Sequence, residues 1–317
     1  MSSKDKYAAL CDRDESIPVF SRPWWLDATA GPAMWDVALA ERGGIVTAAM
    51  PFCMRRRAWL TALKMPPLTQ VLGPHIVNRS YASENERLSA EKSQFQALLN
   101  ALPVADYVQF YMHNRYTNWL PFYWAGYRQT TLYSYEIPNI EDSDKVFANF
   151  ERSKQKDVRK ASKLVGVAFD LDAEQFYKNH ELVLRKQGRT ISYSYDLFRR
   201  IHDAAYRHAS GRTIYAVDVR GNLHAALFVV WAREGAYDLI STIDPDFRQS
   251  GAASLVVNEA IKLVAPYSHR FDFEGSMDER VEASFRHFGA IQRPYMALKK
   301  VTSLLLRARE ALYVARR

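Results

Sequence analysis

The chain of 317 residues contains few cysteines and no long apolar segment. Its two cysteines, Cys11 and Cys53, cannot build a disulfide framework, which fits a reducing compartment. No apolar run approaches the roughly 18 residues that a membrane-spanning helix needs. The first ten residues, MSSKDKYAAL, lack the apolar core of a signal peptide. We therefore expect a cytoplasmic protein, with peripheral contact at the inner membrane face as a further option.

Several catalytic motifs are also missing from the sequence. It contains no C-x-x-C pair, no H-E-x-x-H, no G-x-S-x-G and no P-loop, and its eight histidines show no metal-ligand spacing. These absences argue against a zinc hydrolase, a serine hydrolase and a P-loop nucleotidase, and we expect no metal. The basic residues are scattered over both halves, so a DNA-binding module is not favoured.

The composition is that of a folded protein with an anionic partner. The chain is 48% hydrophobic and 25% charged, and its length favours two domains. A net charge of +8 favours an anion such as CoA, tRNA, an anionic lipid or a phosphorylated glycolipid. Charge alone does not choose among them.

Strand and helix patterns alternate along the whole chain, which predicts an α/β (α+β) fold. The strand patterns at 35–41 and 45–57 flank a Gly-Gly turn and predict an antiparallel hairpin. Residues 142–164 read as one polar helix that ends before Gly166. We place a domain boundary there, with one domain at residues 1–142 and a second at residues 143–317.

A faint internal repeat relates the two halves. Four residues of the first half recur at a fixed offset of 163 positions in the second half. The pairs are Phe110 and Phe273, Phe122 and Phe285, Gly126 and Gly289, and Gln129 and Gln292. In both copies a strand, a helix and a strand follow in the same order, which favours a duplicated α/β unit.

The segment from Asp244 to Lys300 carries the most specific pattern. A predicted strand, AYDLISTI, is followed by an R-x-x-G-x-A run that opens a helix. Free backbone N–H groups at a helix N-terminus can hold a pyrophosphate, and a glycine lets the backbone approach it closely. The run predicts an anion-binding loop made of Arg248, Gln249, Ser250, Gly251, Ala252 and Ala253. The alternative is an ordinary helix start capped by Ser250.

Two acidic residues follow on the next predicted strand, RFDFEGS. Asp272 and Glu274 alternate with Phe271 and Phe273, so the carboxylates share one face and the rings the other. One carboxylate could act as a general base toward an ammonium group. The alternative is an ion pair with a neighbouring arginine, or Glu274 as the cap of the next helix.

These motifs together resemble the Fem-type, double-GNAT group of N-acyltransferases, including its BioF2-like members. The resemblance rests on P23-WWLDA, M65-PPLTQVLGP, the helix ERSKQKDVRKASKLVGV, D244-PDFRQSGAA and F271-DFEGS with FRHFGA, and it runs from about Pro18 to Lys300. It implies two tandem GNAT-like domains with mixed central sheets flanked by helices. It also implies an acyl-CoA donor, such as acetyl-CoA, or an aminoacyl-tRNA donor as in the cross-bridge enzymes.

The resemblance assigns donor binding to the second domain, because PPLTQVLGP in the first lacks the R-x-x-G-x-A pattern. Many GNAT enzymes carry a tyrosine four residues before the helix-ending glycine, where it can protonate the leaving thiolate. Phe285 stands there in this chain and cannot do so. His287 is a weak substitute, with a packing or surface histidine as the alternative.

The acceptor is expected to be an amine of an amino-sugar, a lipid-linked saccharide or a small metabolite. Segments similar to RKQGRTISYSY lie near the acceptor in the family, so Arg189, Tyr193 and Tyr195 are the substrate-binding candidates, with exposed charges beside packed tyrosines as the alternative. A tRNA partner is less favoured, although a basic stretch at residues 152–163 could face one; the alternative there is a solvated linker helix. A non-catalytic GNAT-like protein that binds an anionic partner is the remaining alternative.

The basic C-terminal helix, predicted from about residue 301, could rest on an anionic membrane. Its apolar stripe consists of Val301, Leu304, Leu305, Ala308 and Leu312, and its arginines are Arg307, Arg309, Arg316 and Arg317. Packing of this helix on its own domain is the alternative.

Overall fold

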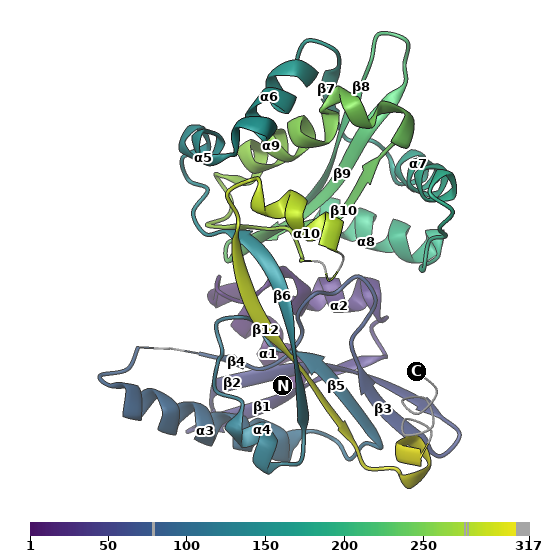
Figure 1. The fold of residues 1–317 in the computed structure, drawn as a ribbon. Helices are drawn as coiled ribbons and strands as arrows, with labels where there is room; N and C mark the ends of the chain where they lie inside the picture. The colour runs from purple at the N-terminus through teal and green to yellow at the C-terminus, as the bar shows by residue number, and fades with distance from the viewer. Residues whose placement is uncertain (78–79, 276, 278, 309–317) are drawn as a thin grey trace. The chain divides into compact units, whose positions relative to one another are not determined.

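The computed structural model describes residues 1–77, 80–275, 277 and 279–308 (Figure 1). The chain divides into two compact units, one made of residues 1–132 with the return from Pro294 and one made of residues 133–293. The expected boundary at residues 142 and 143 lies ten residues beyond the first change of unit. The predicted apolar and basic residues Leu312, Arg309, Arg316 and Arg317 lie outside the described part of the chain.

The first unit is built on an antiparallel hairpin. Gly43 and Gly44 have φ values of +58° and +80°, as the two central residues of a type I′ turn require, so β1 and β2 form the predicted pair. The strand order is β1-β2-β3-β5-β12, with β4 paired to β2. Its elements are α1 (Ser3–Arg13), η1 (Val19–Ser21), α2 (Pro23–Thr29), β1 (Trp35–Arg42), β2 (Ile45–Arg57), β3 (Leu60–Lys64), β4 (His75–Ile76), α3 (Glu84–Ala101), β5 (Tyr107–Tyr111) and α4 (Leu120–Trp124).

The chain changes from one unit to the other within two of its strands. They are β6 (Arg128–Ile137) and β12 (Ile291–Val301). The strand order of the second unit is β6-β11-β10-β9-β8-β7, in which only β10 and β11 run parallel. Its other elements are α5 (Ser143–Asn149), α6 (Arg152–Ala161), β7 (Gly166–Phe169), α7 (Ala173–Lys186), α8 (Tyr195–Arg207), β8 (Gly211–Val217), β9 (Leu223–Ala232), β10 (Gly235–Ile243), η2 (Pro245–Ser250), α9 (Ala252–Val264), β11 (Phe271–Asp272) and α10 (Glu279–Arg286).

Helices cover both faces of the second unit's sheet (Figure 1), which makes β9 apolar and buried almost throughout. Leu227 and Val229 pack with α9 in one core cluster. Phe228 points to the other face, where its ring lies 5.7 Å from that of Phe198 in α8. Buried layers on both faces hold β10, the strand that leads to the predicted loop, in a fixed position.

The segment predicted as one polar helix is two helices, α5 and α6. Phe150 interrupts the helix in an extended conformation with ψ 145°, and Glu151 is also extended. The Phe150 ring is buried 5.1 Å from that of Phe288, so core packing at this position overrides helix propensity. The single-helix prediction was therefore wrong at Phe150 and Glu151.

Candidate functional site

The predicted anion-binding loop is η2 and the first turn of α9. It follows β10 directly, and Asp244 begins it by accepting a hydrogen bond from the amide of Asp246. Lys186 of α7 ties the loop down, because its Nζ lies 2.7 Å from Asp244 and 2.6 Å from Asp246. The six predicted residues thus lie on a loop whose first residues are held by ion pairs with α7.

Gly251 is required both by its backbone conformation and by a close contact. Its φ is +80°, and a Cβ built on it would lie 2.5 Å from the carbonyl oxygen of Asp157 in α6. From the same helix, Lys160 donates a hydrogen bond to the carbonyl of Gln249. Helix α6 therefore packs against the loop at Gly251, and Lys160 of the predicted basic stretch bonds to the loop backbone.

The start of α9 offers two free amides. The Ala252 amide donates to the Ser250 hydroxyl, and those of Ser254 and Leu255 donate to the carbonyl of Gly251. Within the part of the chain that the structure describes, the amides of Gly251 and Ala253 have no acceptor. The side chains of Arg248 and Gln249 are exposed, and Arg248 forms no ion pair with a described residue. This donor set fits a phosphate or pyrophosphate.

The neighbouring strands β10 and β11 diverge just before this loop. They pair in parallel only at Ala236 with Phe271 and at Tyr237 with Asp272, while β10 continues to Ile243. A register shift between Asp238 and Ile240 places a bulge in β10, so one residue has no partner on β9. Beyond Tyr237, no strand among the described residues pairs with this edge of β10.

The chain leaves β11 through a tight and strained turn. Glu274 and Gly275 have φ values of +59° and +65°, and a Cβ on Gly275 would lie 2.0 Å from the carbonyl oxygen of Tyr133. A left-handed conformation at a residue other than glycine costs roughly 1–3 kcal/mol and often marks a functional position. The predicted strand RFDFEGS is therefore shorter than expected, and Glu274 lies beyond its end.

Glu274 carries an enclosed carboxyl oxygen. Its Oε1 is buried and has no hydrogen-bond partner among the residues that the structure describes. Burial, and then the negative charges of Asp272 and Asp238, raise the pKa of Glu274 well above its ordinary value. This environment favours the protonated carboxyl over the carboxylate.

Asp272 is buried and fully hydrogen-bonded, in contrast to Glu274. It accepts hydrogen bonds from the Ser134 hydroxyl, from the Glu274 amide at 2.8 Å and from Arg270 Nη1 at 2.7 Å. Burial raises the pKa of Asp272 despite the opposing charge of Arg270. The expected ion pair with an arginine therefore exists, and Asp272 also fixes the backbone of Glu274.

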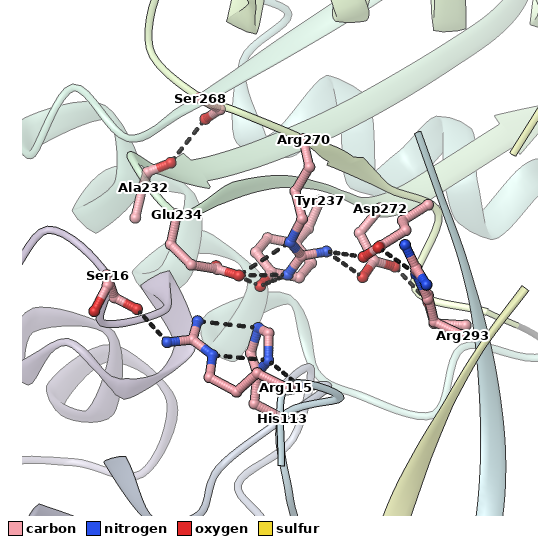
Figure 2. A network of polar contacts seen from close by, with 12 residues as sticks. Ser16, His113, Arg115, Ala232, Glu234, Tyr237, Ser268, Arg270, Asp272 and Arg293 are labelled. Atoms are coloured by element: carbon pink, nitrogen blue, oxygen red, sulfur yellow. Dashed lines mark hydrogen bonds and ion pairs between the residues drawn. The ribbon is translucent and has the colours of Figure 1, made fainter. Parts of the chain in front are cut away.

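Arg270 is the centre of a buried ionic network (Figure 2). Its guanidinium contacts three carboxylates, those of Glu136 at 3.1 Å, Glu234 at 2.7 Å and Asp272 at 2.7 Å. It also donates to the Tyr237 hydroxyl at 2.6 Å. The burial of this arginine among three acids links β6, β10 and β11 at the point where the last two diverge.

Asp238 is a carboxyl at this position that the sequence patterns did not single out. It is 8% exposed, and both of its oxygens accept from the hydroxyl of the exposed Ser241, at 2.7 and 2.8 Å. Burial raises the pKa of Asp238 to about 7. A lone acid in the otherwise apolar pattern AYDLISTI was the signal that could have revealed it.

The remaining predicted residues lie elsewhere in the second unit. His287 follows α10 and lies 3.7 Å from Glu151, the residue before α6. Tyr193 and Tyr195 pack around Tyr177 of α7, with ring centroids 6.1 and 5.4 Å away. Arg189 is exposed just after α7. Burial, and then the positive charge of Arg189, lower the pKa of His180 to about 4. The structure does not bring these residues into contact with Glu274.

The corresponding opening in the first unit is filled by the chain itself. Strands β3 and β5 pair in parallel at Ala62 and Leu63. Beyond that point, Leu72 of the PPLTQVLGP segment exchanges two backbone hydrogen bonds with Tyr111, at 3.0 and 3.2 Å. This loop therefore pairs with β5 where β5 has separated from β3. In the second unit, the matching edge is the one between β10 and β11, which is open among the described residues.

No helix in the described part of the chain is both long enough and apolar enough to span a bilayer. The same residues contain no group of three or more His, Cys, Asp or Glu arranged to hold a metal ion.

Comparison with known proteins gives a family match and several similar folds. Residues 148–279 match the family model of the acetyltransferase (GNAT) domain. The crystal structure of FemX superposes with a TM-score of 0.70 at 12% identity, over 93% of this chain and 96% of that chain. A tandem GNAT protein from the clavulanic acid biosynthesis pathway gives 0.51 at 10% identity, over 95% and 97%.

No curated protein matches the chain in sequence. At such low identities the structural similarities establish the fold alone, which is that of FemX and of the tandem GNAT protein. The match to the acetyltransferase (GNAT) domain lies in the second unit and supports an acyltransferase.

Proposed function

We propose that the protein transfers an acyl group from an acyl-CoA to an amine, and that the reaction takes place in the second unit between β10 and β11. The observation that carries the proposal is the buried Oε1 of Glu274 where these strands diverge, which has no hydrogen-bond partner in the described part of the chain. The same β10 leads directly into the loop with two free amides. A phosphate-binding site and a proton-transfer group therefore lie on connected elements of one GNAT domain.

The loop fits the donor's pyrophosphate. The amides of Gly251 and Ala253 point out of the N-terminal end of α9, where the helix dipole favours negative charge. Arg248 adds an exposed positive charge that has no ion-pair partner among the described residues, while Ser250 and Ala252 shape the turn. When bound, the donor supplies the activated thioester carbonyl.

The opening between the strands fits the reacting atoms. The bulge in β10 and its unpaired edge leave backbone amides that can polarise the thioester carbonyl. Glu274 is the proton-transfer residue at the reacting nitrogen, and Asp272 positions it through the bond to its amide. The filled opening beside β5 in the first unit supports the assignment of a single donor site.

The acceptor we propose is an amine of an amino-sugar, a lipid-linked saccharide or a small metabolite. Arg189, Tyr193 and Tyr195 remain candidates for its recognition, and His287 a candidate for a minor role in proton transfer. The cytoplasm, with peripheral contact at the inner membrane face, is the location we propose. Leu304 and Leu305 support the membrane contact, because they are 78% and 67% exposed.

A second candidate function uses aminoacyl-tRNA as the donor. It is favoured by the exposed cations of α6 beside the loop, among them Lys156 and Arg159. Phosphate contacts of this kind would make the affinity fall steeply with salt.

Calorimetric titration with acetyl-CoA separates these functions. We expect binding to the wild-type protein and weaker binding to Arg248→Gln. Arg220→Gln is the matched control, because Arg220 is equally exposed and lies in the β8–β9 turn of the same unit. Absence of acetyl-CoA binding, together with salt-dependent retention of charged tRNA on a filter, would replace the acyl-CoA proposal with the tRNA alternative.

A further inference from the structure

Glu274 cannot by itself account for the protons of the proposed reaction. An amine acceptor arrives largely as an ammonium, which must lose one proton before its nitrogen can attack. The buried Oε1 of Glu274 and the negative charges beside this carboxyl favour its protonated form, which makes Glu274 a poor base. A second group must therefore take the ammonium proton, and Phe285 offers none to the leaving sulfur.

Asp238 stands where such a group is needed. It lies on β10 at the bulge, one residue beyond the last residue of β10 that pairs with β11. Glu274 lies two residues beyond the same last pair, Tyr237 with Asp272, after the end of the other strand, so the two carboxyls flank the divergence of β10 and β11. No arginine or lysine forms an ion pair with Asp238 in the described part of the chain. By contrast, Arg270 compensates Asp272, Glu136 and Glu234.

The environment of Asp238 also provides a route to solvent. Ser241 is exposed, and its hydroxyl donates to both oxygens of the buried Asp238. A proton on Asp238 can thus pass to water through this hydroxyl. The titration of Asp238 near pH 7 suits a base that must be regenerated at each turnover.

We propose that Asp238 and Glu274 form a catalytic carboxyl pair in which Asp238 is the base and protonated Glu274 is the acid. This inference rests on the proposed acyl transfer. Asp238 takes one proton from the acceptor ammonium, and the nitrogen lone pair forms the C–N bond with the thioester carbon. As the C–S bond breaks, its electron pair leaves on sulfur, which receives the proton of Glu274. Glu274 recovers a proton from the nitrogen, and the proton on Asp238 leaves through Ser241, so that one proton is released per amide formed.

Two carboxyls whose environments separate their proton affinities are a general way to divide acid and base roles. Here the separation has a visible cause. Asp238 accepts from the hydroxyl of the exposed Ser241, whereas the buried Oε1 of Glu274 has no donor among the described residues. The pair also supplies the acid that Phe285 cannot.

Infrared difference spectroscopy tests the pair without any substrate. At pH 8 we expect a protonated-carboxyl band that is lost in Glu274→Gln. In Asp238→Asn this band should titrate at a lower pH than in the wild type, because a neighbouring negative charge is gone. A missing band, or an unchanged titration midpoint, would overturn the proposal.

Turnover gives the second readout, measured as thiol release from acetyl-CoA with glucosamine and a panel of primary amines. We expect Asp238→Asn to lose about 10²-fold in kcat and the acidic limb of the pH profile, and Asp238→Glu to recover part of both. Asp196→Asn, an exposed change in α8, is the control that should alter neither. An intact acidic limb in Asp238→Asn would exclude Asp238 as the base.

The two proposals fail in different ways. If acetyl-CoA does not bind the wild-type protein, the acyl-CoA function is wrong, while the infrared result still decides whether the carboxyls are paired. If acetyl-CoA binds the wild type and Asp238→Asn equally well and both turn over at the same rate, the donor site stands and the role of Asp238 is refuted.

Discussion

Replacement of Gly251 by alanine tests the packing that shapes the donor loop. The new Cβ would lie 2.5 Å from the carbonyl oxygen of Asp157, a backbone atom that cannot rotate away. The positive φ of +80° adds a cost of roughly 1–2 kcal/mol for a residue with a side chain. Overpacking against backbone typically adds about 1–3 kcal/mol. We expect a total loss of about 2–5 kcal/mol in the free energy of unfolding of the second unit.

Gly221→Ala is the matched control. Gly221 lies in the same unit with φ +83°, but nothing lies within 4 Å of a Cβ there. It therefore carries only the conformational cost, and the difference between the two variants isolates the contact with α6. For a unit of this size, each kcal/mol corresponds to a shift of about 2–4 °C in Tm.

The assay is thermal unfolding followed by circular dichroism, with acetyl-CoA binding measured on the same samples below the transition. We expect Gly251→Ala to unfold at a temperature about 2–12 °C below that of Gly221→Ala, with weaker acetyl-CoA binding, because α6 and the loop can no longer approach each other. Equal Tm values for the two variants would show that the close approach does not constrain the loop.

Three further changes test other parts of the site. Arg270→Gln leaves the buried carboxylates of Glu234 and Asp272 without their cation, while Glu136 keeps its ion pair with Arg293, and it should destabilise the second unit by about 3–5 kcal/mol in urea unfolding. Arg233→Gln, an exposed control, should change little, and a loss below about 1 kcal/mol in Arg270→Gln would contradict the network. Lys186→Gln frees Asp244 and Asp246 and should weaken acetyl-CoA binding in calorimetry; an unchanged Kd would show that the anchor is dispensable. His180 has its pKa lowered from 6.5 to about 4, so the folded state binds fewer protons than the unfolded state between these values. Stability should therefore fall as the pH drops from 6.5 toward 4, and His180→Phe should show less of this loss in the urea midpoint.

The fold could be predicted because the pattern and the resemblance agree. The Gly-Gly turn led to the hairpin of β1 and β2, and the apolar strands proved to be buried. The repeat residues also play matching parts, since Phe110 contacts Phe122 at 5.4 Å and Phe273 contacts Phe285 at 4.9 Å. The prediction of a single helix failed at Phe150, because the periodicity of a sequence carries no information on a contact with a distant residue such as Phe288.

The site could be predicted only in part. The loop from Arg248 to Ala253 has a local signature, so its position after β10 was accessible from the sequence. The different environments of Asp272 and Glu274 could not be predicted from the sequence. They depend on hydrogen bonds from Arg270 and Ser134 to Asp272 and on the left-handed backbone of Glu274. These are contacts between residues far apart in the chain or departures from strand geometry.

The most direct test of the account is a crystal structure of the protein with CoA bound. It should show the pyrophosphate on the amides of Gly251 and Ala253 and the sulfur between β10 and β11, beside the carboxyl of Glu274. A pyrophosphate bound elsewhere, or a sulfur remote from Glu274, would contradict the donor site and the proposed chemistry.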